Sequence, residues 1–231
     1  MKGASRVKGN QELMIAVLFL NLVLAGCSTV RQVRAREQHA AGERVPKSLA
    51  NAGECGESVY DYAKSSNWKS TDAILVALKE AVKQVRADVE DQSAGKDRLD
   101  GNVAALDRAV TTKNQQAAMH EANQVTFDVA DMTLAYRLSV PVEVTRLDYY
   151  GRELEIWAEA GDADKLHATV RGIQREWDAL RLSVEAHDAI EAKTFGALVA
   201  QIEAVKTPAD YARLATSVLD EVDNLEQVFQ R

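Results

Sequence analysis

Apolar residues recur at steps of three and four along the chain from Trp68 almost to its last residue. This spacing places them on one face of an α-helix, whereas a half-buried strand alternates apolar and polar residues, and no convincing alternation of that kind competes. The pattern therefore predicts an all-α fold with seven stripes. The stripes are Leu75, Leu78, Val82, Val85 and Val89; Leu99, Val103, Leu106 and Val110; Ala118, Ala122, Val125, Val129 and Met132; Val144, Leu147, Tyr150, Leu154 and Trp157; Leu166, Val170, Ile173, Trp177 and Leu180; Leu198, Ile202 and Val205; and Leu214, Val218, Leu225 and Val228.

Residues that begin or end helices stand between the stripes and separate them. Those expected to cap the start of a helix are Thr71 with Asp72, Asn114, Asp162 and Thr207. Pro141 is expected to end the third helix, because its ring disfavours helical geometry at the preceding residue. Gly161 is expected to end the fourth. Gly95 and Gly101 weaken the first connection, so one long, kinked helix over the first two stripes is an alternative.

We therefore expect an antiparallel helical bundle over residues 67–231, either of four-helix type or an array of αα-hairpins. Roughly 165 residues are enough to bury a core without a disulfide or a metal. Residues 113–132 can be laid over 161–180 with their stripes in register, and 207–228 fit this frame less well. A duplicated hairpin and the shared demands of any amphipathic hairpin both account for this likeness.

Residues 27–66, ahead of the bundle, are expected to form a polar tether. They hold few residues that fill a core, several arginines and glutamates, and glycines at positions 42, 53 and 56. Such a composition is typical of a flexible, disordered linker. The short piece Val59-Tyr60-Asp61-Tyr62 can either dock on the bundle or stay with the tether.

The first 26 residues have the organisation of a secretory signal. Lys2, Arg6 and Lys8 precede an apolar run over residues 13–20, which resumes over 22–25 after Asn21. A charged start followed by a short apolar run is typical of a cleaved signal peptide. A membrane-spanning helix needs ~20 apolar residues, so an uncleaved anchor helix is only the alternative.

The apolar run closes on Leu24-Ala25-Gly26-Cys27 and resembles the lipobox of bacterial lipoproteins, in which Leu and two small residues precede Cys. The resemblance implies cleavage between Gly26 and Cys27 and acylation of Cys27 with chains such as palmitate. Each buried methylene adds ~0.8 kcal/mol, so this anchor would be stable. Ser28 stands where lipoproteins retained at the inner membrane often carry Asp. The expected location is thus the outer membrane, facing the periplasm, if the host is Gram-negative.

The chain is acidic, with a net charge of −7 that becomes −9 when residues 1–26 are removed with their three bases and one acid. This charge gives no electrostatic reason to bind nucleic acid or to lie on anionic lipid. The lipid on Cys27 therefore has to hold the protein at the membrane. With Cys27 acylated, Cys55 has no partner for an intramolecular disulfide, and it is either incidental or a thiol that pairs with another molecule.

Three histidines are the candidate ligands if the bundle holds a metal or a non-covalent haem. His120 lies off its stripe and is expected to be solvated. His167 stands at a core edge, and His187 at a helix C-terminus, where a protonated ring suits the dipole. None belongs to a Glu-x-x-His pair, and no cofactor is predicted. Haem held by Met119 or Met132 with His167 or His187 resembles haem-binding cytochrome bundles in architecture only.

The most distinctive run is residues 141–157, which gathers two Tyr, a Trp, two Arg and four acids around Gly151. Glycine inside a helix costs ~1 kcal/mol against alanine, so a close neighbour is expected at Gly151. The candidate binding face consists of Asp148, Tyr149, Arg152 and Trp157. The alternative is a central helix with aromatic packing and surface ion pairs.

No nucleophile–base arrangement, phosphate-binding glycine loop or metallopeptidase motif is present in the sequence, so no catalytic residue is predicted. The chain looks like envelope lipoproteins that couple a lipobox to a helical bundle. That resemblance implies an anchored, non-catalytic module that binds another envelope protein or a small ligand. A periplasmic metal- or haem-binding bundle for storage, sensing or electron transfer is the alternative.

Overall fold

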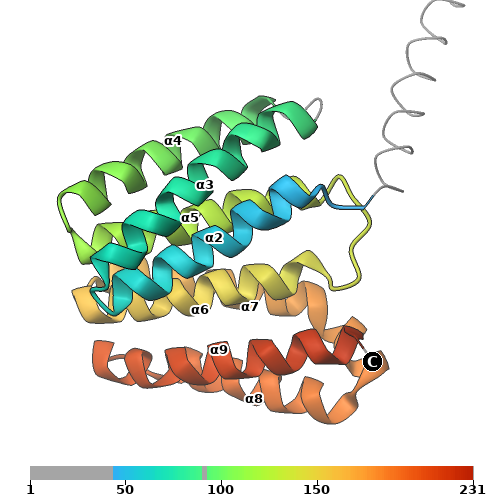
Figure 1. Cartoon of the computed structure of the whole chain (residues 1–231). Coiled ribbons are helices and arrows are strands. Elements are labelled where there is room, and N and C mark those ends of the chain that lie inside the picture. The colour runs from blue at the N-terminus through green and yellow to red at the C-terminus, as the bar shows by residue number, and fades with distance from the viewer. Residues whose placement is uncertain (1–43, 90–92, 231) are drawn as a thin grey trace, which may run out of the picture. The chain divides into compact units, whose positions relative to one another are not determined.

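The structure, a computed structural model, describes residues 44–89 and 93–230 of the chain. This described part holds eight α-helices and no strand, which confirms the all-α prediction (Figure 1). The signal-like segment and the lipobox with Cys27 lie outside the described residues. The helices are α2 (Lys47–Lys64), α3 (Trp68–Asp88), α4 (Ser93–Thr111), α5 (Gln115–Thr133), α6 (Val142–Ala160), α7 (Ala163–His187), α8 (Ala189–Ala204) and α9 (Pro208–Gln230).

The helices form two consecutive four-helix bundles, each with its own apolar core. In the first, α2 packs on α3 and α5, and α4 closes the ring against α3 and α5. In the second, α6 packs on α7 and α9, and α8 closes the ring in the same way. The only side chain of α6 buried in the first core is that of Ile156. Successive helices run antiparallel, so the predicted four-helix type and hairpin array are both present, as a tandem of bundles (Figure 1).

Helix α2 corrects the prediction that residues up to 66 belong to a tether. Its side chains Leu49, Val59 and Tyr60 are almost fully buried in the first core. A Cβ at Gly56 would lie 2.9 Å from a methyl of Thr126, so α2 and α5 approach closely at this glycine. The folded unit therefore begins at Arg44, not at residue 67. Small residues, Ser48, Ala52, Gly56 and Ala63, occupy four of the seven buried positions of this helix, so its apolar stripe is weak in the sequence.

Most helix boundaries follow the expected residues. Asn114, Asp162 and Thr207 each accept a hydrogen bond from the backbone N–H three residues later. Gly161 ends α6 in the left-handed region, with φ of 68°. Helix α3 begins earlier than expected, because the side chain of Asn67, not that of Thr71, caps its N-terminus. Pro141 stands before α6, since α5 already ends at Thr133.

The two bundles share one plan of buried and capping positions. Equivalent residues 95 positions apart are Pro46 and Pro141, Leu49 and Val144, Gly56 and Gly151, Val59 and Leu154, Leu75 and Val170, Leu78 and Ile173, Val82 and Trp177, and Val85 and Leu180. The turn between the first two helices also matches, with Ser66 and Gly161 both at positive φ, 54° and 68°. In α5 and α9 the equivalent buried pairs, Ala122 with Ala215, Val125 with Val218 and Val129 with Val222, are 93 positions apart.

This correspondence corrects the register expected for the duplication. The sequence superposition laid α5 on α7, but α5 is the fourth helix of its bundle and α7 is the second of its own. The counterpart of α5 is α9, and the counterpart of α7 is α3. Any two amphipathic stripes can be aligned by their apolar steps; caps, turns and close-approach glycines discriminate between registers.

Candidate functional site

Helix α6 joins the two bundles, and the region where it meets α2 and α5 is called the seam here. One face of α6 lies in the second core, where a Cβ at Gly151 would come within 2.8 Å of Leu219 on α9. The close neighbour expected at this glycine is therefore confirmed. The aromatic and charged residues of the run 141–157 lie outside this core or at its edge, where Tyr150 and Trp157 pack against it from one side.

A buried carboxylate lies at the centre of the seam. Glu153 is only 4% exposed, yet both of its oxygens are bonded. Its Oε1 accepts a hydrogen bond of 2.9 Å from Asn123 Nδ2 and lies 3.0 Å from His120 Nδ1. Its Oε2 accepts a bond of 2.6 Å from the indole N–H of Trp157. Two donors from α5 and one from α6 thus hold a single acid, and the contact fixes α6 against the first bundle.

His120 is part of this cluster, which corrects the expectation that it is solvated. The ring is half-buried, and its centroid lies 5.0 Å from that of Trp157. Burial by itself lowers the pKa of His120. The hydrogen bond and negative charge of Glu153, with the charge of Glu121, outweigh burial and the opposing charge of Lys165, so the pKa rises above its usual value. The protonated ring is therefore the form that the seam favours.

A separate chain of ion pairs crosses four helices. Arg98 of α4 lies 3.0 Å from Asp128 of α5 and 3.4 Å from Asp131. Asp131 pairs at 2.7 Å with Arg146 of α6, which lies 3.6 Å from Glu176 of α7. Asp128 and Glu176 are buried, at 3% and 5% exposure. Removing Arg98 or Arg146 would leave a buried carboxylate uncompensated, so the network ties the orientation of the bundles to these partners.

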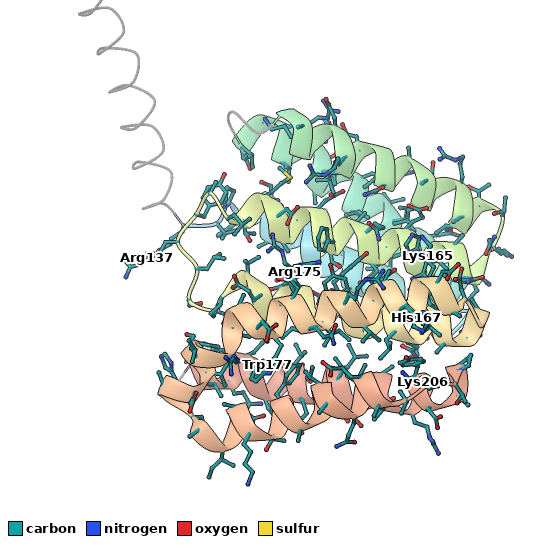
Figure 2. The ribbon with its side chains drawn as sticks, turned by 180° about the vertical axis from the view of Figure 1, so that it is seen from behind. Arg137, Lys165, His167, Arg175, Trp177 and Lys206 are labelled. Carbon is teal, nitrogen blue, oxygen red and sulfur yellow. The ribbon has the colours of Figure 1, made fainter. Side chains whose placement is uncertain are left out.

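Aromatic rings line the same side of α6 and are half-buried. Phe127 of α5 and Tyr149 of α6 have ring centroids 4.6 Å apart, and Tyr150 follows at 5.0 Å from Tyr149. Arg146 lies over Phe127, at 5.9 Å, and Arg175 lies over Tyr150, at 5.7 Å. Figure 2 shows Arg175, from α7, in the region between the ribbons of α5 and α7. Rings flanked by cations offer stacking and charge to a ligand or partner.

The opposite side of α6 meets α2 through a second set of charges. Arg152 pairs with Asp148 at 3.1 Å, lies 4.0 Å from Glu57 and stands over the ring of Tyr60 at 5.1 Å. The hydroxyl of Tyr60 donates a 2.7 Å hydrogen bond to Glu155. Burial is the largest cause that raises the pKa of both Glu57 and Asp148, against the lowering effect of Arg152.

The four residues expected to form one binding face lie on two sides of α6. Tyr149 and Trp157 turn toward α5, where Gln124 donates a 2.6 Å hydrogen bond to the Tyr149 hydroxyl. Asp148 and Arg152 turn toward α2. All four are half-buried, so the run is a contact helix between bundles and presents only the edges of these residues to solvent.

The candidate haem ligands are not brought together. His167 and His187 are exposed on α7, and the Nδ1 of His187 lies 2.8 Å from the carbonyl oxygen of Ser183. Met119 and Met132 are buried in the first core, at 2% and 1% exposure. The pairings of these methionines with His167 or His187 therefore do not fit one site. Among the described residues, no group of three His, Cys, Asp or Glu side chains is placed to hold a metal ion.

A cleft of about 320 Å³ opens beside the seam, where α2, α5 and α6 meet the connection between α5 and α6. It is lined by Ala50, Gly53, Glu54, Glu57, Thr126, Val129, Ala130, Thr133, Leu138, Ser139, Val140 and Thr145. Sequence patterns do not predict it, because one wall belongs to α2, a segment whose composition predicts a tether. A small ligand with an apolar body and a positive group would meet matching chemistry here.

Comparisons with protein-family models, with curated proteins and with solved structures found no match to this chain. Within the described residues, every helix is too short or too polar to cross a bilayer.

Proposed function

We propose that this protein is a lipid-anchored component of a bacterial cell envelope whose tandem bundles bind another protein or a small ligand without catalysing a reaction. The observation that carries the anchor is the run Leu24-Ala25-Gly26-Cys27 behind a charged and then apolar N-terminus. The outer membrane, facing the periplasm, is the location that Ser28 favours in a Gram-negative host.

The binding role is supported by the side of the seam that carries the aromatic rings. Phe127, Tyr149 and Tyr150 are half-buried there beside Arg146 and Arg175, and the rings remain partly open to solvent. Aromatic and arginine side chains are enriched where proteins bind partners. A haem or metal role has less support, because its candidate ligands lie apart.

The anchor is tested by Cys27→Ser with Cys55→Ser as its matched control. The unaltered chain and the Cys55 variant should fractionate with membranes and gain the mass of a diacylglycerol and an acyl chain. The Cys27 variant should lose both properties. Equal membrane fractionation and mass behaviour in all three proteins would refute the anchor.

The binding surface is tested by photocrosslinking in the envelope. A photoreactive residue at Arg175, whose side chain is 63% exposed, should capture a discrete species, and Tyr149→Ala should weaken that capture. The same residue at Arg181, exposed six positions further along α7, is the control and should not capture it. Identical products at both positions would contradict a binding surface at the seam.

A further inference from the structure

Large apolar side chains that are exposed concentrate at one end of the described helices. Five such side chains are exposed in this part of the chain: Tyr62, Val76, Leu134, Leu182 and Ile190. Leu134 is 54% exposed in the connection after α5, and Ile190 is 80% exposed in the first turn of α8. Leu182, 66% exposed, stands in the last turns of α7. The last three lie in or beside the connections α5–α6 and α7–α8, which share one end of the described helices.

That end is also where the folded chain begins. Because successive helices run antiparallel, the start of α2, the connection between α5 and α6, the connection between α7 and α8 and the end of α9 lie together (Figure 1). The opposite end holds the turns at Ser66, Lys113 and Gly161. Leu134, Leu182 and Ile190 therefore stand at the end that carries Arg44.

The position of Cys27 relates this end to a membrane. Cys27 precedes Arg44 by 17 positions, and 17 residues span at most about 60 Å. The helices are roughly 25 to 35 Å long at 1.5 Å per residue, so the far end lies that much further from the point of attachment. If the chain is anchored at Cys27, the end with Arg44 is the one that the anchored segment joins directly.

We propose that this end of the two bundles rests on the lipid bilayer and inserts Leu134, Leu182 and Ile190 at its surface. The inference rests on the lipid anchor of the proposed function. Arg44, Lys47 and Arg137 are exposed at the same end, and Figure 2 shows Arg137 pointing away from the bundles. Basic side chains suit the headgroup level beside inserted apolar residues. Acidic side chains such as Glu185 are also exposed at this end. Insertion of the apolar side chains, rather than net charge, therefore supplies most of the free energy of membrane binding.

The lipidated full chain, reconstituted in phosphatidylethanolamine–phosphatidylglycerol vesicles with brominated acyl chains, provides the test. In a Cys55→Ser background, a fluorophore is attached at Ile190→Cys or, as the matched control, at Val76→Cys. Val76 is 68% exposed in the middle of α3, away from the end with Arg44. Both sites are exposed, so neither substitution should disturb a core. Brominated lipid should remove fluorescence at position 190 and leave position 76 unchanged.

The mass of the reconstituted protein shows whether a negative result contradicts the lipid anchor or only the membrane-facing end. A chain without lipid on Cys27 would overturn the anchor and this inference with it. A lipidated chain whose two positions are quenched equally, or not at all, would overturn only the membrane-facing end. Protection of position 190 from a water-soluble quencher without quenching by brominated lipid would show that protein covers it, and this too would overturn the proposal.

Discussion

Replacing Glu153 by glutamine tests whether the buried acid holds the seam together. The two side chains have nearly the same shape, but a carboxylate accepts at both oxygens and an amide accepts at only one. In the seam, Oε1 faces Asn123 and His120, and Oε2 faces Trp157. Whichever way the amide turns, its NH₂ group meets a donor. The substitution therefore removes the charge and leaves at least one buried donor without an acceptor.

The magnitude follows from these contacts. A hydrogen bond to a charged group contributes about 1.5 to 3 kcal/mol, and a buried donor left unsatisfied costs about 1 to 3 kcal/mol. Relief of the desolvation of a buried charge offsets part of this loss. We expect Glu153→Gln to lower the free energy of unfolding by about 2 to 3 kcal/mol, a large share of the 5 to 15 kcal/mol typical of a folded protein.

Urea unfolding of residues 28–231 followed by circular dichroism measures this change. For a protein of this size, 2 to 3 kcal/mol corresponds to a fall of about 1 M urea in the midpoint. Glu159→Gln is the matched control, because Glu159 is exposed near the end of the same helix. Its midpoint should stay within the range of surface substitutions, about 0.5 kcal/mol. Equal, small effects of the two substitutions would show that Glu153 does not hold the seam together.

The other predictions concern the protonation of the seam and the close approach of helices. Because the pKa of His120 is raised in the folded protein, its pairing with Glu153 stabilises fully below the unfolded-state pKa of about 6.5 and is lost as the pH rises through the higher folded value. Stability measured from pH 6 upward should therefore fall more steeply than in His120→Asn; parallel curves would contradict the pairing. Gly101→Ala should stabilise by about 0.5 to 1 kcal/mol, because nothing lies within 4 Å of the added Cβ. Gly56→Ala should destabilise by about 1 to 3 kcal/mol, because its Cβ would crowd α5. If thermal or urea unfolding found Gly56→Ala more stable than Gly101→Ala, the close approach of α2 and α5 would be contradicted.

The pattern of large apolar residues predicts most of the helices. Every member of the stripe from Leu75 to Val89 is buried, as is every member of the stripe from Leu166 to Leu180. Helix α2 is not predicted, because Ala52, Gly56 and Ala63 supply much of its contact surface. Small residues add little to the hydrophobic periodicity by which a helix is recognised. Such small residues allow another helix to approach closely, and that contact is visible only in the folded structure.

The seam could be predicted only in part for a related reason. The sequence drew attention to α6, but it could not show which residues of other helices meet it. Glu153 and Asn123 are 30 positions apart, and Tyr60 and Glu155 are 95 apart. His120 read as solvated because it lies off the apolar stripe of its own helix, although that off-stripe face is the one that α6 covers. Contacts between bundles depend on helix placement, which hydrophobic periodicity leaves open.

The most direct test of the proposed function is the mass of the N-terminal peptide of the protein isolated from the membranes of a bacterial host. We predict a peptide that begins at Cys27, lacks residues 1–26 and carries a thioether-linked diacylglycerol. A peptide that begins upstream of Cys27, or one whose Cys27 thiol is unmodified, would contradict lipid anchoring and with it the membrane-facing end.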